Sequence, residues 1–355
     1  MHIPDGYLSP ATCAVTGAVM APVIGIACAK TKEVVKERQA PLLALGAAYS
    51  FMVMMFNIPI PDGTTAHAVG AVLIAVLLGP WAAVICVSVA LVIQALFFGD
   101  GGVLALGANT LNMALVMPFV GYGIYRLLTQ NTSLTSRRRA LAAGIGGYVG
   151  LNAAALCAAI EFGLQPTLFH SANGTPLYAP FHLAQTIPAM ALAHLTIAGA
   201  AELILTVGIV AYLQRANLPL LRINHAGIVD TDAELAPASG RPALRWALIG
   251  IATMIVLSPL GLLAPGGAYG EDAPVDLNLH KSGLSAIPSG LQHYNSFWKR
   301  TLLPDYGFSS GEHANLAYVL SAVFGAFVVG ATIFLLIGAI RAVARRRPGL
   351  RVGEA

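Results

Sequence analysis

The first two residues of the chain could form a metal chelate. The free amine of Met1, the amide nitrogen of His2 and the His2 imidazole can close adjacent chelate rings around one ion. One in-plane position then remains for another imidazole, and His67 follows a turn-rich stretch, PIPDGTT at 59–65. Such a planar nitrogen set suits Ni(II) or Cu(II), allows Co(II) and disfavours Ca(II) and Mg(II). The alternative without a metal is that His2 is a surface residue and that His67 is a hydrogen-bonded residue at the start of a helix.

Three further polar residues could support such a site. Asp62 either orients His67 as a hydrogen-bond acceptor or simply forms the turn, and the turn is the better interpretation. Asn109 and Asn112 are three residues apart and therefore lie on one face of a helix. They either hold a loop over the metal or form hydrogen bonds between helices.

Two ionisable residues, His194 and Glu202, lie inside a long apolar run, where polar groups are functional candidates. They are eight residues apart and share a helix side only loosely. Helix packing or contact with a partner subunit is favoured over a role in metal passage. Several catalytic signatures are missing, including the P-loop, His-Glu-x-x-His and Gly-x-Ser-x-Gly patterns. An ATP-driven cycle would therefore need separate ATPase subunits.

The composition indicates which class of fold must position these residues. Of the 355 residues, 57% are hydrophobic and only 10% are charged, and the mean hydropathy is +0.73. Soluble domains carry about 25% charged residues, so this chain cannot cover a water-facing surface. We predict an all-α, polytopic helical membrane protein. The apolar runs are continuous rather than alternating, which excludes a transmembrane β-barrel.

About nine apolar segments are long enough, or nearly so, to be membrane crossings. The third is too short to cross comfortably. The segments are 9–29, 40–56, 66–78, 81–98, 106–125, 140–162, 185–213, 245–263 and 315–340.

The basic residues predict the orientation of these segments. If nine segments alternate, 17 of the 20 Lys and Arg residues fall on one side, which is the cytoplasmic side by the positive-inside rule. The N-terminus and His67 are then outside and the C-terminus is cytoplasmic. The opening residues lack the pattern of a signal peptide, so we expect Met1 to be retained. Because the arginines flank membrane helices, nothing suggests nucleic-acid binding.

The opening stretch resembles a known family. Residues 1–10, MHIPDGYLSP, are similar to the N-terminal signature of the CbiM/NikM family, the substrate-capturing membrane subunits of energy-coupling-factor transporters for cobalt and nickel. The similarity continues at GTTAH (63–67), GANTLNM (107–113) and at His194, Glu202 and Thr206. The resemblance implies that Met1, His2 and His67 hold the metal. It also implies a transmembrane coupling protein and two cytoplasmic ATPase subunits as partners.

The end of the chain resembles the small two-helix CbiN/NikN, or PDGLE-type, component. The similarity rests on LSPLGLLA (257–264), Gly270-Glu271, Trp298 and PDY (304–306), where Tyr306 departs from the Pro-Asp-Gly core. We therefore predict three parts: a metal-binding membrane domain of about seven helices at 1–215, a cytoplasmic linker at 216–243, and a helical hairpin with a large outer loop at 244–355.

These observations predict a transporter subunit rather than an enzyme. It would capture nickel or cobalt, with a slight preference for nickel, in the plasma membrane of a prokaryote, surrounded by lipid and with no permanently bound cofactor. One alternative is a self-sufficient secondary metal transporter, although only Glu161 and Glu202 lie near the apolar segments as candidate coupling carboxylates. The other is an intramembrane metalloenzyme, which would need a water-activating position and a general base.

Overall fold

A computed structural model describes residues 1–34, 40–60, 64–225, 240–264, 267–271, 273–280 and 282–345. Within these ranges the chain is mostly helical, as predicted. The longer helices are α1 (Pro10–Val34), α2 (Ala40–Met54), α4 (Pro80–Ile93), α6 (Met117–Leu128), α7 (Arg137–Leu168), α8 (Leu183–Ala193), α9 (Gly199–Ala216), α11 (Gly240–Leu257) and α13 (Ala314–Arg345).

Shorter elements connect and extend these helices. They are β1 (Ile58–Pro59), β2 (Thr65–Ala66), α3 (Ala71–Leu78), α5 (Leu106–Asn109), α10 (Leu218–Arg222), α12 (Ser289–Tyr294) and the 3₁₀ turns η6 (Ser258–Leu263) and η7 (Pro304–Tyr306). Three more are π-helical: η2 (Gln94–Phe98), η3 (Thr110–Val116) and η4 (His194–Ala198). Single π-helical turns inside longer helices are frequently found at functional sites.

Seven helical stretches in the described residues are long and apolar enough to cross a bilayer. They run over Pro10–Thr31, Pro80–Phe98, Leu106–Leu128, Arg137–Leu168, Leu183–Ala216, Arg245–Leu263 and Ala314–Ala339. Of the other two predicted segments, α2 has 15 residues and α3 only eight. The predicted count of nine is therefore not confirmed, and the orientation in the membrane stays a prediction.

The short α3 ends where the backbone changes direction. Gly79 has φ +93°, a conformation that favours glycine, and it closes α3 and precedes Pro80 at the start of α4. Residues 66–70, which the hydropathy pattern assigned to this segment, are instead mostly an irregular loop. His67 therefore lies in a loop, ahead of the helix.

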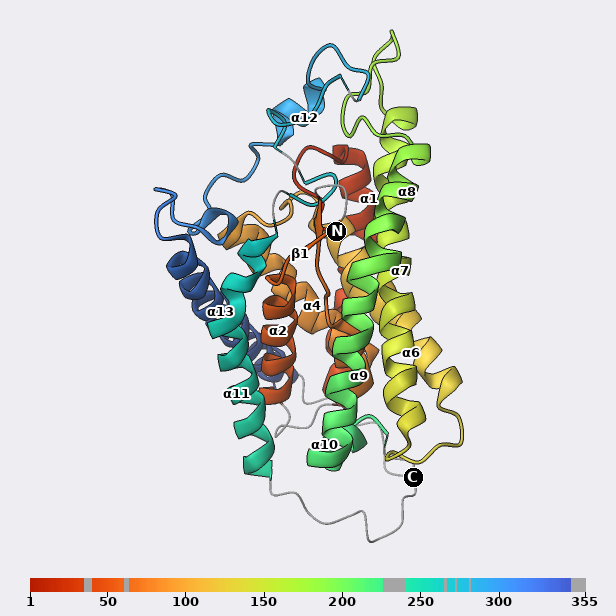
Figure 1. Cartoon of the computed structure of the whole chain (residues 1–355), viewed down its shortest axis with the longest axis vertical. Helices are drawn as coiled ribbons and strands as arrows, with labels where there is room; N and C mark the ends of the chain where they lie inside the picture. Colours follow the sequence, from red (N-terminus) through yellow and green to blue (C-terminus); the bar gives the residue numbers. More distant parts are fainter. Residues whose placement is uncertain are drawn as a thin grey trace.

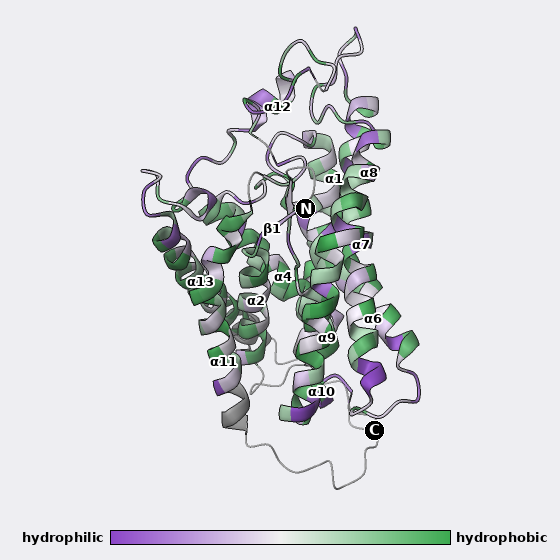
Figure 2. Ribbon diagram, viewed as in Figure 1, coloured by the Kyte–Doolittle hydropathy of each residue, from purple (hydrophilic) through white to green (hydrophobic). Residues whose placement is uncertain are grey.

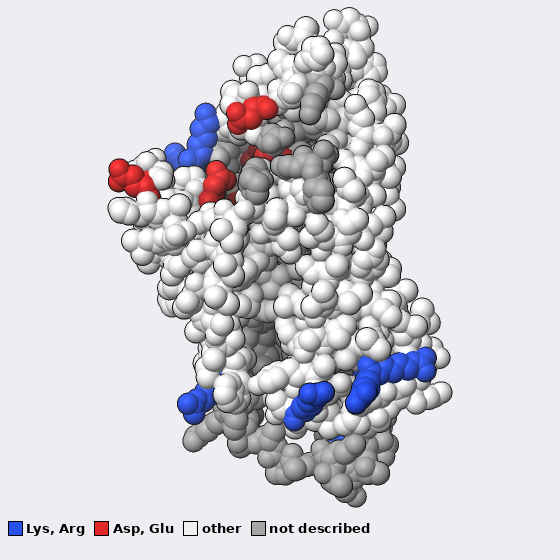
Figure 3. All heavy atoms as spheres, in the orientation of Figure 1, with Lys and Arg blue, Asp and Glu red and all other residues white. Residues whose placement is uncertain are grey.

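The helices form an elongated bundle, with the N-terminus drawn into one end (Figure 1). α7 packs between α6 and α9, whereas α11 and α13 both pack against α2. Apolar residues dominate the middle of the bundle (Figure 2). On the face in Figure 3, Lys and Arg gather mainly at the end opposite the N-terminus, and Asp and Glu lie at the other end. Two ends of unlike charge separated by an apolar belt are typical of a membrane-spanning bundle.

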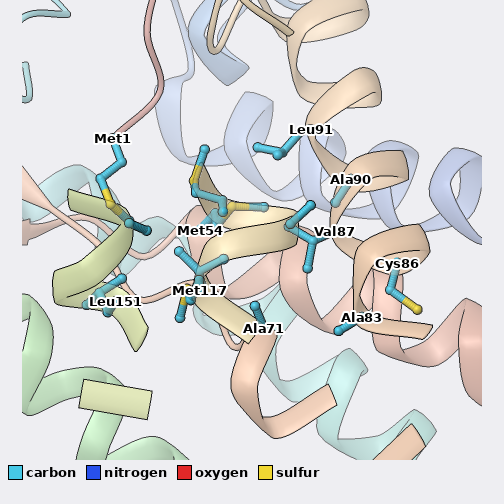
Figure 4. Packing of buried hydrophobic residues seen from close by; sticks show 14 of the residues in the cluster. Met1, Met54, Ala71, Ala83, Cys86, Val87, Ala90, Leu91, Met117 and Leu151 are labelled. Carbon is cyan, nitrogen blue, oxygen red and sulfur yellow. The ribbon is translucent and has the colours of Figure 1, made fainter. Parts of the chain in front are cut away.

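The interior is one hydrophobic cluster that reaches the first residue of the chain. Met1 belongs to it together with Met54, Met117 and Leu151 (Figure 4). Outward-facing apolar side chains remain exposed, such as Ile204 at 67% and Leu335 at 75%, because a bilayer would cover them. Burial of Met1 in this cluster fixes the position of the terminal amine.

Candidate metal centre

The N-terminal segment, residues 1–9, is a buried strap rather than a free tail. The side chains of Met1 and Ile3 are buried on either side of His2. Asn109 donates to the Ile3 carbonyl at 3.1 Å and accepts from the Ile3 amide at 2.8 Å, so one side-chain amide pairs with both polar groups of the strap. Gly102 also donates to the Ile3 carbonyl at 2.8 Å. These bonds hold His2 at a set depth in the bundle.

Gly102 is required by this close contact. A Cβ atom at this position would lie 2.4 Å from the amide nitrogen of Asp5, inside the strap backbone. Asp5 in turn accepts from the Leu104 amide at 2.8 Å. The loop after η2 and the strap are therefore packed backbone to backbone.

His67 is held by the loop that precedes α3. β1 pairs antiparallel with β2, and His67 follows β2 directly. Ser50 donates to the Val69 carbonyl at 2.8 Å, and Glu202 accepts from the amides of Val69 and Gly70 at 2.8 and 3.0 Å. His67 Nδ1 lies 3.0 Å from the Ala68 carbonyl. When Nδ1–H donates there, the lone pair of Nε2 is free to bind a metal.

His2 on the strap faces His67 on the loop that precedes α3. His67 Nε2 lies 3.3 Å from His2 Nδ1, and the ring centroids are 4.9 Å apart. Two nitrogens at right angles on one ion, each about 2 Å from it, are about 2.8 Å apart. Small movements would thus bring both nitrogens onto one ion. Nδ1 is also the His2 ring nitrogen that closes a six-membered chelate with the His2 amide.

Backbone nitrogens make up half of the candidate ligand set. Among the described residues, no group of three or more His, Cys, Asp and Glu side chains is placed to hold a metal ion. The candidate set is instead the Met1 amine, the His2 amide, His2 Nδ1 and His67 Nε2. Four nitrogens without thiolate suit Ni(II), Co(II) or Cu(II) better than Zn(II), which prefers a tetrahedron.

Burial keeps both imidazoles neutral. Loss of solvent lowers the pKa of His2 to about 4, assisted by the positive terminal amine and opposed by the charge of Glu271 and by the polar side chain of Gln94. Burial also holds the pKa of His67 well below its usual value, together with the charges of His2 and the amine. Neutral rings have the lone pairs that a metal needs.

Two carboxylates approach the same nitrogens. Glu271 Oε1 accepts from the Met1 amine and from the His2 amide, each at 3.0 Å. Asp100 Oδ1 lies 3.2 Å from His2 Nδ1, and burial raises the pKa of Asp100. Ala268 also bridges to Thr65 beside the His67 loop. The C-terminal hairpin thus contacts both segments that carry the candidate ligands.

Sequence reasoning did not identify Asp100 or Glu271 as site residues. Asp100 stands between Gly99 and Gly101 after an apolar run, a turn pattern without a chemical signature. Glu271 entered the sequence analysis only as one of the residues that make the hairpin similar to the CbiN/NikN component. Its contact with Met1 spans 270 residues of sequence, which no local pattern reveals.

The other candidates have separate positions. Asn109 holds the strap, whereas Asn112 donates to Glu161 on α7 at 2.7 Å and so links two helices. His194 Nδ1 bonds to the Met190 carbonyl at 2.8 Å within its own helix. Glu202 supports the His67 loop. Asp62 lies outside the described residues.

Comparison with known proteins gives a consistent answer. Residues 2–220 match the family model described as the cobalt uptake substrate-specific transmembrane region. The chain is 50% identical to the "Fused nickel transport protein NikMN" of Rhodobacter capsulatus over 98% of this chain and 99% of that one. It is 45% identical to the "Probable fused nickel transport protein LarMN" of Lactiplantibacillus plantarum, over 91% and 93% respectively.

A solved structure agrees with this assignment. A crystal structure of a truncated transition metal transporter is 59% identical and covers 60% of this chain and 98% of its own, with a TM-score of 0.56. The fused relatives extend across the C-terminal hairpin as well, so the similarity includes both parts of the chain. The chain is a multi-pass membrane protein that belongs to the CbiM family of nickel and cobalt transport proteins, in the form in which CbiM/NikM is fused to NikN.

Proposed function

We propose that this chain is the substrate-capture subunit of an ATP-driven uptake system for a divalent transition metal, with nickel favoured over cobalt. The observation that carries the proposal is the approach of His2 Nδ1 and His67 Nε2 to 3.3 Å beside the buried amine of Met1. The four nitrogens would bind the ion at the outer end of the bundle. The preference for nickel rests on the planar nitrogen set and on the names of the fused relatives.

Capture at this site selects the ion, and energy for uptake enters through other subunits. We propose a transmembrane coupling protein and two cytoplasmic ATPases as those partners, since the chain has no P-loop of its own. We place the N-terminus and His67 outside and the basic end of the bundle at the cytoplasm. Residues 1–215 would be the capture domain, 216–243 the linker and 244–355 the accessory hairpin.

Insertion of one leucine between Met1 and His2 tests the metal site, since a bulky second residue leaves Met1 in place. The amine is then one residue further from the imidazole, and we expect nickel affinity to fall at least about a hundredfold, beyond the 10–100-fold effect of losing a neighbouring hydrogen bond. Nickel and cobalt are titrated side by side on detergent-purified protein with metal analysis. Unchanged affinity for both metals would exclude the site.

A matched control moves the insertion away from the site. One leucine inserted between Asn131 and Thr132, in the turn after α6, should leave nickel binding intact. The partner proposal has its own test: vesicles that hold this chain alone should bind nickel but show no ATP-dependent accumulation. Accumulation driven by ATP in such vesicles would contradict it.

A further inference from the structure

Two buried polar atoms beside the metal centre lack a hydrogen-bond partner among the described residues. They are His2 Nε2 and Gln94 Oε1. Gln94 is fully buried and His2 is 3% exposed. Buried polar atoms are nearly always paired in native proteins, so each unpaired one requires an explanation. One of these two is a ring nitrogen that can carry a proton, and the other is an acceptor.

The orientation of the Gln94 amide follows from its neighbours. Tyr306 donates its hydroxyl hydrogen to Asp100 Oδ2. That hydroxyl can then only accept from Gln94, so the group 2.9 Å from it must be the Nε2 amide of Gln94. Gln94 Nε2 also lies 3.5 Å from Asp100 Oδ2. With the amide nitrogen engaged by these two acceptors, the carbonyl oxygen is directed elsewhere.

The His2 ring is the neighbour that needs such an acceptor. When Nδ1 gives its lone pair to a metal, the single proton of the neutral imidazole sits on Nε2. Metal-bound histidines almost always donate this other N–H to a fixed acceptor. Gln94 is a neighbour of His2, because both side chains contact the carboxylate of Asp100.

We propose that Gln94 is a positioning residue whose Oε1 accepts Nε2–H of His2, leaving Nδ1 for the metal, and that Tyr306 orients Gln94 for this role. The inference rests on the proposed function, because it concerns the same metal. It makes the C-terminal hairpin, which contributes Tyr306, a determinant of how His2 binds.

The hairpin forms hydrogen bonds with the segment that contains Gln94. The π-helical turn η2 follows α4 and ends that helical stretch, and the hairpin supplies hydrogen-bond donors to its carbonyls. Trp298 Nε1 donates to the Leu96 carbonyl at 2.9 Å, and the amides of Leu302 and Leu303 donate to the Phe97 carbonyl at 2.9 and 3.1 Å. The hairpin thus stabilises the turn that places Gln94.

The backbone at Tyr306 gives independent support. Tyr306 has φ +62° and Asp305 has φ +50°, in the left-handed region that favours glycine. The backbone of a large residue in this region is strained, and the contacts of its side chain must offset that strain. The ring stacks on Phe98 at 4.7 Å, and the hydroxyl joins Gln94 to Asp100.

The test compares nickel affinity and the ligand-field absorption of saturated protein in several variants. Gln94→Met keeps the side-chain length but removes the acceptor, and we expect affinity to fall about 10–100-fold with a shifted absorption band. Gln94→Glu retains an acceptor oxygen and should return affinity to within about threefold of wild type. Tyr306→Phe keeps the stacked ring and should lower affinity by about three- to tenfold.

The Gln94→Met, Tyr306→Phe double variant should bind no more weakly than Gln94→Met, because Tyr306 acts through Gln94. Two controls match these changes away from the centre. Gln214→Met removes a glutamine bonded to the Leu134 and Ser136 carbonyls, and Tyr125→Phe removes a buried hydroxyl that accepts from Arg139 and bonds to His225. Both should bind nickel as wild type does.

Three results would overturn the proposal. They are wild-type affinity in Gln94→Met, equal losses in Gln94→Met and Gln94→Glu, and a weaker Gln94→Met whose saturated absorption is unchanged while its melting temperature falls. The last would mean that Gln94 only supports the fold. Failure of the proposed function looks different, because wild type itself would then bind no nickel or would bind it unaffected by the Met1–His2 insertion.

Discussion

Two buried polar clusters in this protein differ in where their polar atoms point. In the N-terminal cluster (Met1, His2 and His67), the two rings bring their nitrogens within 3.3 Å of each other, and both backbone nitrogens point to one oxygen of Glu271. In the membrane-embedded pair (His194 and Glu202), the bonded atoms face protein backbone: His194 Nδ1 bonds to the Met190 carbonyl and Glu202 Oε2 to two amides of the His67 loop. Convergence on shared space indicates ligand binding, whereas pairing with backbone indicates support.

The largest effect is expected when this distinction is tested with two histidines. His67→Ala removes a ligand and should lower nickel affinity at least about a hundredfold, more than loss of an indirect neighbour does. His194→Ala, its matched control, should change affinity by no more than about threefold. Titration of purified protein with nickel measures both. Equal losses would mean that the two clusters do not differ in this way.

An intermediate effect is expected for Glu202. Glu202→Gln weakens two charge-assisted hydrogen bonds to the amides of Val69 and Gly70. We expect the free energy of unfolding to fall by about 1–3 kcal/mol. Nickel affinity should fall by about tenfold because the His67 loop is less well placed. Thermal melting and nickel titration test this. A loss of affinity as large as that of His67→Ala would assign Glu202 to the metal site itself.

The two asparagines allow the same comparison, because Asn109 bonds the strap and Asn112 bonds a neighbouring helix. Asn109→Ala frees the Ile3 backbone and should lower nickel affinity by about tenfold. Asn112→Ala breaks the bond to Glu161 and should lower only the melting temperature. The pair is compared in the same titration. Wild-type affinity in Asn109→Ala would show that the strap holds its position without this clamp.

The smallest effect concerns acid stability of protein kept in a chelator. Because burial lowers the pKa of His67, the unfolded chain takes up a proton first as pH falls below 6.5, and the folded state loses stability. The stability of the fold with a neutral His67 is fully present above pH 6.5. Below that pH, the free energy of unfolding falls by at most about 1.4 kcal/mol per pH unit. His67→Asn should therefore lose less melting temperature than wild type between pH 7 and 5. Parallel curves would contradict the low pKa.

Sequence reasoning predicted the helical membrane fold and brought together Met1, His2 and His67, because terminal position, turn residues and apolar runs are local features. The rest depended on contacts between distant segments. α3 has only eight residues because residues 67–70 ahead of it form a loop, held by hydrogen bonds from Ser50 and to Glu202, and hydropathy does not distinguish an apolar loop from an apolar helix. Gln94, Asp100 and Glu271 reach the site only after the chain folds back on itself, and no spacing rule links them to residue 2.

The contact of Met1 with Glu271 also sets an order of events during synthesis. The strap is made about 270 residues before the carboxylate that bonds it, and contacts of such long range form late in folding. The growing chain therefore cannot form this contact until the hairpin has been made. A truncated product would keep the four candidate nitrogens but would lack the carboxylate that bonds the Met1 amine and the His2 amide.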